Sequence, residues 1–200
     1  MKHIVYSLGD KLYLNLTNRC PCACTFCIRQ NGDTVGDSDS LWLEREPTAD
    51  EVVAALSSWD LSAWQELVFC GYGEPTCALE VLLATCRYVR GCSSIPIRLN
   101  TNGLGDLVNG KPVAPLLAEL VDTVSVSLNT ADAVRYEELC HPQFGQEAFD
   151  AMLRFAVHCR AHVPEVVLSV VDVLSPEELE ACRLLAEQRG LPLRVRHFEE

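Results

Sequence analysis

Short runs in which apolar and polar residues alternate recur along the chain, and stretches with helical spacing separate them. Such runs predict β-strands, because successive side chains of a strand point to opposite faces of its sheet. We expect strands at 12–17, 66–70, 95–101, 123–129, 166–172 and 192–198. Helices are expected to fill the gaps between them.

Two helix starts are legible. Thr48 with Glu51 forms a capping-box pattern, and Ser175 with Glu178 forms a second one that has Pro176 at the first helical position. Strands that alternate with helices indicate an α/β fold with a parallel sheet. Six strands are too few for a closed eightfold barrel, which typically needs about 250 residues. We therefore predict a partial (β/α)6 barrel that forms one domain over residues 1–200.

The predicted strands have two different faces. One face is apolar: Leu12, Leu14, Leu16, Leu67, Phe69, Ile97, Leu99, Val124, Val126, Leu128, Val166, Leu168, Val170, Leu193 and Val195. The other is mostly polar: Asn15, Thr17, Cys70, Arg98, Asn100, Asn102, Ser125, Ser127, Asn129, Ser169, Arg194 and Arg196. A parallel strand buried on both faces would be almost wholly apolar. The pattern favours an open, polar-lined cavity on the inner side, with solvent-exposed edge strands as the alternative.

Charge and composition narrow the class of protein. The 200 residues carry a net charge of −12, which disfavours broad binding to nucleic-acid backbones. The first sixteen residues are interrupted by Asp10 and Lys11 and have no long apolar core. We therefore expect neither a signal peptide nor a membrane span, and we predict a cytoplasmic protein.

Eleven cysteines are many for such a chain. The cytosol keeps thiols reduced, so metal or cluster binding is a better explanation than a disulfide framework. Cys20, Cys24 and Cys27 follow the first predicted strand with the spacing C-x3-C-x2-C. Three thiolates on one loop can hold three irons of a [4Fe–4S] cube and leave the fourth iron open. A zinc site with Cys22 as fourth ligand, or free thiols, are the alternatives, although zinc sites usually pair two separate C-x2-C units.

This cysteine spacing, with Phe26 before the last cysteine, resembles the signature of the radical S-adenosylmethionine superfamily. The resemblance implies one [4Fe–4S] cluster held by Cys20, Cys24 and Cys27, with no assigned role for Cys22. It also implies that S-adenosylmethionine binds the open iron. One electron, from an external donor, would then break the sulfonium C–S bond, and the resulting 5′-deoxyadenosyl radical would abstract a hydrogen atom from a substrate.

A second motif, Gly71-Tyr72-Gly73-Glu74-Pro75, follows the strand at 66–70. By itself it is consistent with a plain turn between strand and helix, or with a backbone edge that a ligand can approach closely. Beside the cysteine loop it resembles the Gly-Gly-Glu motif of the superfamily. That resemblance implies that Gly71, Gly73 and Glu74 receive the amino group of S-adenosylmethionine.

Later strand ends carry further resemblances. Asn100 and Asn102 match the strand end that contacts the ribose, Ser127 and Asn129 match positions that reach the carboxylate or ribose, and Val171 matches an adenine contact. An Asn-Gly turn and ordinary packing are the alternatives. The motifs lie in order at the strand ends where α/β barrels place their sites.

Two segments resemble a smaller group within the superfamily. The stretch 31–46 and the ending Arg194-Val195-Arg196 are similar to the short enzymes found beside TatD-type metal-dependent hydrolases, which implies a functional link to such a hydrolase. Since Leu193 and Val195 should pack under helices, both arginines should turn inward and bind an anionic group of the substrate. An open edge strand, where arginines discourage strand pairing, is the alternative.

The leading hypothesis is therefore a radical S-adenosylmethionine enzyme that acts on a small molecule, a nucleotide-like compound or a peptide. A second is an activase that places a glycyl radical on a partner protein. A third, from another class, is a zinc-binding adaptor. Colour separates the last from the others, because an iron–sulfur protein is brown whereas zinc is colourless.

Overall fold

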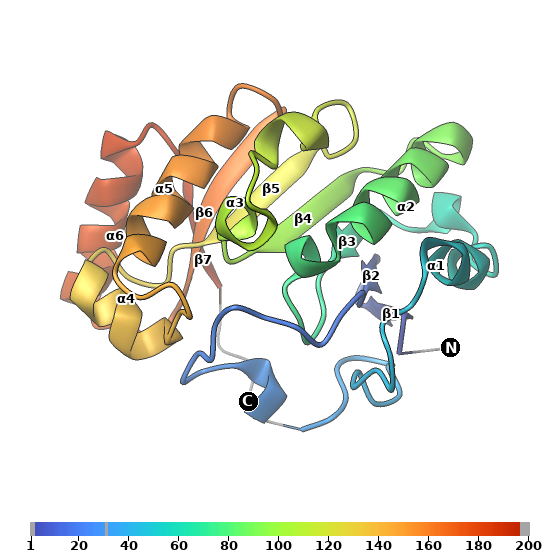
Figure 1. The fold of residues 1–200 in the computed structure, drawn as a ribbon, viewed down its shortest axis with the longest axis horizontal. Coiled ribbons are helices and arrows are strands. Elements are labelled where there is room, and N and C mark those ends of the chain that lie inside the picture. Colours follow the sequence, from blue (N-terminus) through green and yellow to red (C-terminus); the bar gives the residue numbers. More distant parts are fainter. Residues whose placement is uncertain (1–2, 31, 197–200) are drawn as a thin grey trace.

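Seven strands form one sheet, and their spatial order follows the chain (Figure 1). The computed structural model describes residues 3–30 and 32–196. The strands are β1 (Val5–Leu8), β2 (Lys11–Leu14), β3 (Glu66–Phe69), β4 (Ile97–Thr101), β5 (Thr123–Ser127), β6 (Glu165–Val171) and β7 (Leu193–Arg196). Strands β2 to β7 are parallel, and β7 does not pair with β1, so the sheet stays open. The α/β partial barrel is confirmed.

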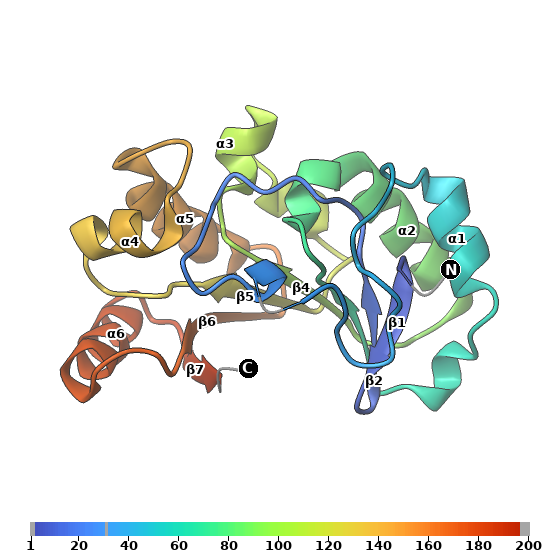
Figure 2. The ribbon, with the colours of Figure 1, turned by 90° about the horizontal axis from the view of Figure 1, so that it is seen from below.

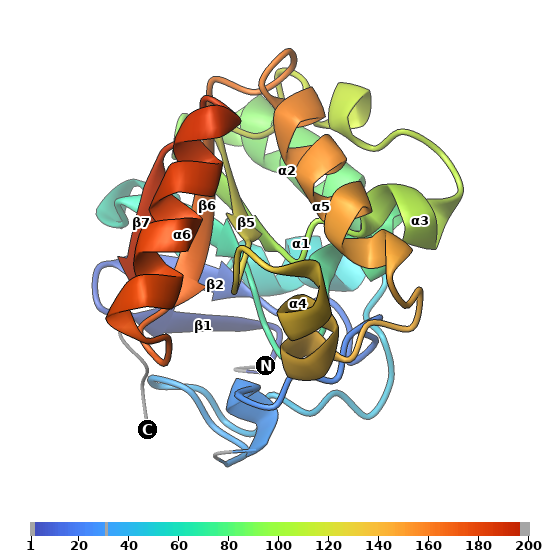
Figure 3. The same ribbon diagram turned by 90° about the vertical axis from the view of Figure 1, so that its left-hand side faces the viewer.

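The helices lie on one side of this sheet (Figures 1 and 3). They are α1 (Ala49–Leu56), α2 (Leu79–Cys92), α3 (Gly105–Asn109), α4 (Ala133–Cys140), α5 (Glu147–Cys159) and α6 (Pro176–Gln188). Short 3-10 turns are η1 (Ile28–Gln30), η2 (Leu61–Ala63), η3 (Pro75–Ala78) and η4 (Ala114–Leu117). Both predicted capping boxes are present, at Thr48 for α1 and at Ser175 for α6. No helix within the described residues is long and apolar enough to cross a membrane.

Strand β1 was not among the predicted elements. It pairs antiparallel with β2, and the two are joined by the two-residue turn Gly9-Asp10, where Gly9 has a φ of 61° (Figure 2). A two-residue hairpin turn of this kind needs residues that tolerate positive φ. The alternation of apolar and polar residues on both sides of Gly9 was the sequence feature that could have predicted this hairpin.

The apolar strand face is the core face, as predicted. Leu12, Leu67, Leu99 and Val124 are fully buried against the helices, and the same holds along the other central strands. Leu193 and Val195 in β7 are partly buried and pack against the same core. The predicted last strand, 192–198, ends at Arg196 in the structure, and its residues 197 and 198 lie outside the described part of the chain.

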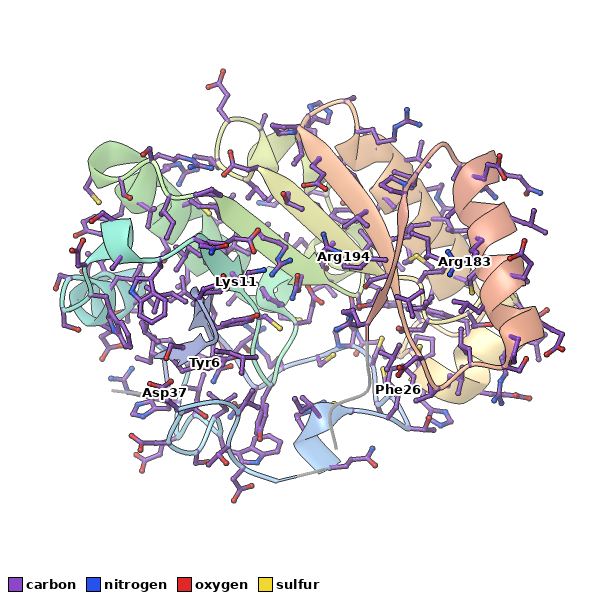
Figure 4. The ribbon with its side chains drawn as sticks, turned by 180° about the vertical axis from the view of Figure 1, so that it is seen from behind. Tyr6, Lys11, Phe26, Asp37, Arg183 and Arg194 are labelled. Atoms are coloured by element: carbon purple, nitrogen blue, oxygen red, sulfur yellow. The ribbon has the colours of Figure 1, made fainter. Side chains whose placement is uncertain are left out.

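The opposite, inner face carries the polar side chains in rows set by the strand register. Arg98 lies level with Thr123 and Glu165, whereas Ser127 lies level with Ser169 and Arg194. Asn100 lies level with Ser125, in the row between these two. Figure 4 views this face, with Arg194 lying over the sheet.

At β2 the inner face of the sheet is covered by other residues of the chain. Asn15 is completely buried, and its side-chain amide donates to the backbone oxygens of His3 and Leu41. Leu41 and Tyr72 pack with Tyr6 over this end of the sheet. The inner face is therefore polar, as expected, but its β2 end is buried and does not line an open cavity.

Candidate functional site

The cysteine loop follows β2 and lies at the carboxyl ends of the strands, between two other loops (Figure 2). On one side, the backbone N–H of Glu74 donates to the Arg19 carbonyl at 2.8 Å. On the other, Ala23 and Thr25 donate to the carbonyls of Cys140 and Leu139 at the end of α4, at 3.0 and 2.9 Å. Loops from three separate strand–helix units thus fix the backbone around the cysteines.

The segment 32–46 binds the cysteine loop through hydrogen bonds and an ion pair. Asn18 both donates to the Leu43 carbonyl, at 2.7 Å, and accepts from the Leu43 N–H. Arg19 makes a two-pronged ion pair with Glu46, at 2.6 and 2.8 Å, and Thr17 also donates to that carboxylate. Planar guanidinium and carboxylate groups match in such a pair, which fixes orientation as well as charge.

Four sulfur atoms gather in this part of the structure. Cys22 is buried between Cys20 and Cys24, and Cys24 also hydrogen-bonds to Cys140. The hydrogen bond with Cys22 lowers the pKa of Cys20, while the one with Cys140 lowers the pKa of Cys24 to about 4. The Asn102 amide nitrogen lies 3.7 Å from Sγ of both Cys20 and Cys22. The loop therefore stabilises thiolates at two of the three predicted ligand positions.

Cys27 is half-buried and directly precedes the short turn η1. Its N–H donates to the Cys24 carbonyl at 3.2 Å, and its own carbonyl accepts from Gln30 at 2.9 Å. Within the described residues, no three Cys, His, Asp or Glu side chains are placed around a single metal ion. A [4Fe–4S] cube has a different requirement, because each thiolate binds a separate iron.

The residues present fit an iron–sulfur cluster. The donors are three thiols on one loop, the backbone there is fixed by neighbouring loops, and Asn102 offers an amide N–H toward the sulfur of Cys20. The positive charge of Arg29 further lowers the pKa of Cys24. Soft thiolate donors are the ligands that iron–sulfur clusters use.

Gly71 and Gly73 serve close packing of the loop in this structure. A Cβ added to Gly71 would lie 2.1 Å from Oδ1 of Asn15, and one added to Gly73 would lie 2.1 Å from the Thr17 carbonyl oxygen. The absence of a side chain thus lets the loop after β3 press against the chain that leads into the cysteines. Both glycines therefore have a packing role in this structure, and their approach to a ligand stays a prediction.

Glu74 is buried and accepts four hydrogen bonds. Oε1 accepts from the backbone N–H and hydroxyl of Thr76 and from the Thr101 hydroxyl, at 3.1, 2.7 and 2.7 Å. Oε2 accepts from the Asn102 N–H at 2.7 Å. Burial raises the pKa of Glu74, and these hydrogen bonds act in the opposite direction. The carboxylate therefore joins three segments of the site, and Oε2 has room for one further donor.

The other predicted S-adenosylmethionine contacts lie at neighbouring strand ends. Asn129, with a φ of 64°, donates from Nδ2 to Sγ of Cys140 at 3.2 Å, while its buried Oδ1 has no hydrogen-bond partner among the described residues. Ser127 is half-buried, and Val171 is buried in β6. Asn100 makes its side-chain hydrogen bond to Cys70. An unpaired buried acceptor is costly in a folded protein, so the Asn129 oxygen suits a ligand that donates to it.

The two C-terminal arginines occupy the inner face. Arg194 is half-buried beside Ser169, and Arg196 is exposed beside Val171. The charge of Arg196 nevertheless acts on the thiol of Cys70 in β3's loop, across the face of the sheet. The strand facing that we predicted for these arginines is the one the register shows.

Sequence reasoning missed Cys140 and Asn15. Cys140 shows no ligand-like spacing, and only the packing of α4 brings it to Cys24. Asn15 holds the loop after β3 by accepting from the Tyr72 N–H at 3.2 Å. The only signal for Asn15 was its place on the polar face of the first predicted strand.

Two surface hollows of about 400 Å³ are lined by none of the site residues that we predicted. One is lined by residues that include Arg90, Asp122 and His162, and the other by residues that include His3, Trp42 and Arg45. Neither is the polar-lined cavity that we predicted on the inner face.

Comparisons with known proteins agree with this geometry. The sequence profile of the Radical SAM superfamily matches residues 14–186. GTP 3′,8-cyclase of Lactiplantibacillus plantarum is 24% identical over 194 residues, which is 96% of this chain and 54% of the cyclase. The structure of Streptococcus suis SuiB bound to S-adenosylmethionine superposes with a TM-score of 0.70 at 18% identity, covering 100% of this chain and 43% of that one.

A third likeness is to TsrM from Kitasatospora setae, a radical S-adenosylmethionine methyltransferase with bound cobalamin and a [4Fe–4S] cluster. The TM-score is 0.57 at 13% identity, covering 94% of this chain and 36% of that one. The chain thus spans about half the length, or less, of these relatives.

Proposed function

The chain belongs to the radical SAM superfamily, and from that premise we propose that it cleaves S-adenosylmethionine reductively and uses the resulting radical on a small anionic substrate. Membership makes it an enzyme whose cofactors are a [4Fe–4S] cluster and S-adenosylmethionine. The observation that carries the proposal is the fixed cysteine loop at the carboxyl ends of the strands, where loops after β3 and α4 hold its backbone.

Cys20, Cys24 and Cys27 would hold the cluster, and neighbouring segments hold the backbone around them by hydrogen bonds. When bound and reduced by an external electron donor, the cluster supplies the electron that breaks the sulfonium C–S bond and yields the 5′-deoxyadenosyl radical, which abstracts a hydrogen atom. Asn102 supports the thiolate form of Cys20 by donating from its amide, at 3.7 Å. Cys22 is assigned no ligand role.

The strand ends beside this loop would bind S-adenosylmethionine. Oε2 of Glu74 accepts one hydrogen bond and can accept another from the amino group. Oδ1 of Asn129, which has no partner among the described residues, can accept from a hydroxyl or an amine. The remaining contacts are assigned by position: Gly71, Gly73, Asn100, Asn102, Ser127 and Val171.

The substrate would bear a negative charge. Arg194 and Arg196 project on the inner face, level with Ser169 and Val171, and guanidinium groups grip carboxylates and phosphates with two hydrogen bonds. A related protein is a cyclase of GTP, itself an anion, which supports the same class. A cytoplasmic location and a functional link to a TatD-type hydrolase remain predictions.

Anaerobic reconstitution with iron and sulfide, followed by S-adenosylmethionine and dithionite, tests this function. We expect a brown protein with broad absorbance near roughly 400 nm, and formation of 5′-deoxyadenosine and methionine. Cys24→Ala should lose both, whereas Cys92→Ala, on the exposed end of α2, should keep both. A colourless, zinc-loaded protein would support the adaptor hypothesis instead. Turnover only with a co-purified partner protein would support the activase.

A further inference from the structure

Arg98 on β4 has an unused hydrogen-bond donor. The residue is more than nine-tenths buried, and its Nε has no partner among the described residues. Its Nη2 pairs with Oε2 of Glu66 at 2.9 Å, and Lys11 lies 3.4 Å from the same oxygen. Glu66 therefore offsets only one of two neighbouring positive charges. An unpaired buried donor is costly, so this side chain is suited to a further acceptor.

Cys70 directly follows β3 and lies level with Asn100 on β4, one row nearer the carboxyl ends of the strands than Arg98. It is half-buried, and its thiol hydrogen-bonds to Asn100. Burial raises the pKa of Cys70, while the positive charges of Arg196 and Arg98 both act to lower it. Two guanidinium groups from β4 and β7 are therefore within electrostatic reach of one sulfur atom on the inner face.

We propose that this part of the inner face, between Arg98 and Arg196 and around Cys70, is a carboxylate-binding subsite for the substrate. The inference rests on the proposed function, in which the substrate is an anion. Arg98 precedes Asn100 by two residues on the same face, so the Arg98 end of the subsite lies roughly 7 Å deeper than the predicted cofactor contacts that begin at Asn100, whereas Arg196 starts level with Val171. The carboxylate end of the substrate thus points away from the cysteine loop.

Access to the subsite is from the side of Cys70 and Asn100, which are both half-buried. Arg98 keeps 8% of its surface exposed, and we infer that a carboxylate reaches its Nε from the side of Cys70. The hydrogen bond formed there satisfies the donor that now has none, and Arg196 supplies the second charge.

The number of free donors favours a carboxylate over a phosphate. Nη2 of Arg98 already pairs with Glu66, so Nε is the donor of this side chain that has no partner among the described residues. A carboxylate has two oxygen atoms to satisfy and a phosphate has more, while Glu66 and Glu165, which lies level with Arg98 across Thr123, supply no donors.

Cys70 itself reports on the subsite through alkylation. The reconstituted holoenzyme is treated anaerobically with iodoacetate, which is an anion, or iodoacetamide, which is neutral, and modification of each cysteine is followed by mass spectrometry. Both reagents react with the thiolate, so the ratio of the iodoacetate rate to the iodoacetamide rate does not depend on the fraction of thiolate. The ratio therefore measures how strongly the site attracts the anionic reagent. We expect this ratio at Cys70 to exceed that at the exposed Cys92 by roughly threefold or more.

Three variants test which residues cause the higher ratio at Cys70. Arg98→Gln and Arg196→Gln should each bring the ratio at Cys70 down toward that at Cys92. Arg183→Gln, an exposed position on α6, is the matched control and should leave the ratio unchanged (Figure 4). If Arg98→Gln does not fold because Glu66 loses its partner, Arg196→Gln still decides the question, because Arg196 is exposed.

Malonate and inorganic phosphate, at equal ionic strength, distinguish the ligand class. Malonate should slow the reaction of Cys70 with iodoacetamide and leave Cys92 unaffected, whereas stronger protection by phosphate would overturn the carboxylate assignment. A ratio at Cys70 equal to that at Cys92, a ratio that both arginine variants leave unchanged, or a Cys70 that neither reagent modifies would overturn the subsite. Alkylation needs no S-adenosylmethionine, so failure to form 5′-deoxyadenosine would refute the proposed function separately.

Discussion

The backbone N–H of Asn102 donates a 2.7 Å hydrogen bond to Oε2 of Glu74, and so ties the end of β4 to the loop after β3. The same Asn102 offers its side-chain amide to Cys20. A buried carboxylate therefore positions a residue beside a predicted cluster ligand without touching that ligand itself.

Glu74→Ala should destabilise the fold strongly. The substitution leaves the N–H groups of Thr76 and Asn102 without their acceptor, and the loss of such a buried network costs about 3–5 kcal/mol. Glu80→Ala, which removes an exposed carboxylate on α2, should change the free energy of unfolding by less than about 0.5 kcal/mol. Denaturant unfolding measures both, and equal effects would contradict the structural role of Glu74.

Stability should fall as pH rises through the window in which Glu74 ionises. Burial raises the pKa of Glu74 above its ordinary value of 4.5. Between pH 4.5 and the raised pKa of Glu74, the folded state binds more protons than the unfolded state, so the free energy of unfolding decreases as pH rises. Glu74→Gln cannot titrate, and although it places an amide where an acceptor is needed, its slope above pH 4.5 should be less negative. Parallel pH profiles for the two proteins would show that Glu74 keeps an ordinary pKa.

Gly73→Ala should disturb the entrance to the cysteine loop. The added methyl group would lie 2.1 Å from the Thr17 carbonyl oxygen and 2.7 Å from that of Arg19, both backbone atoms. We expect a loss of about 1–3 kcal/mol, measured by thermal unfolding, together with lower iron content. Gly91→Ala is the matched control: it meets no atom within 4 Å and lies in α2, where alanine should stabilise by about 0.5–1 kcal/mol.

Cys22→Ala should retain the cluster. Cys22 falls outside the C-x3-C-x2-C spacing, and hydrogen bonds with Cys20 and Cys24, together with burial, raise its pKa and favour the neutral thiol. Iron content and absorbance of the reconstituted protein should match those of the parent, whereas Cys20→Ala and Cys27→Ala should lose both. A colourless Cys22→Ala protein would reassign the ligand set.

The sequence by itself determined the class of fold, and it predicted where a cluster would bind. The alternation in each strand identified the core face, because a strand's period of two directly encodes which side chains meet the helices. The spacing of Cys20, Cys24 and Cys27 is local, so it was readable without a fold. The capping boxes at Thr48 and Ser175 were readable for the same reason.

Only the tertiary structure decided which distant residues meet. The packing of α4 places Cys140 against Cys24, and the folded sheet puts Cys70 within reach of the charges of Arg98 and Arg196, from strands far apart in sequence. The role of Gly73 likewise depends on a backbone more than fifty residues earlier. These contacts arise from the joint packing of several elements, and no local pattern records which residues that packing brings together.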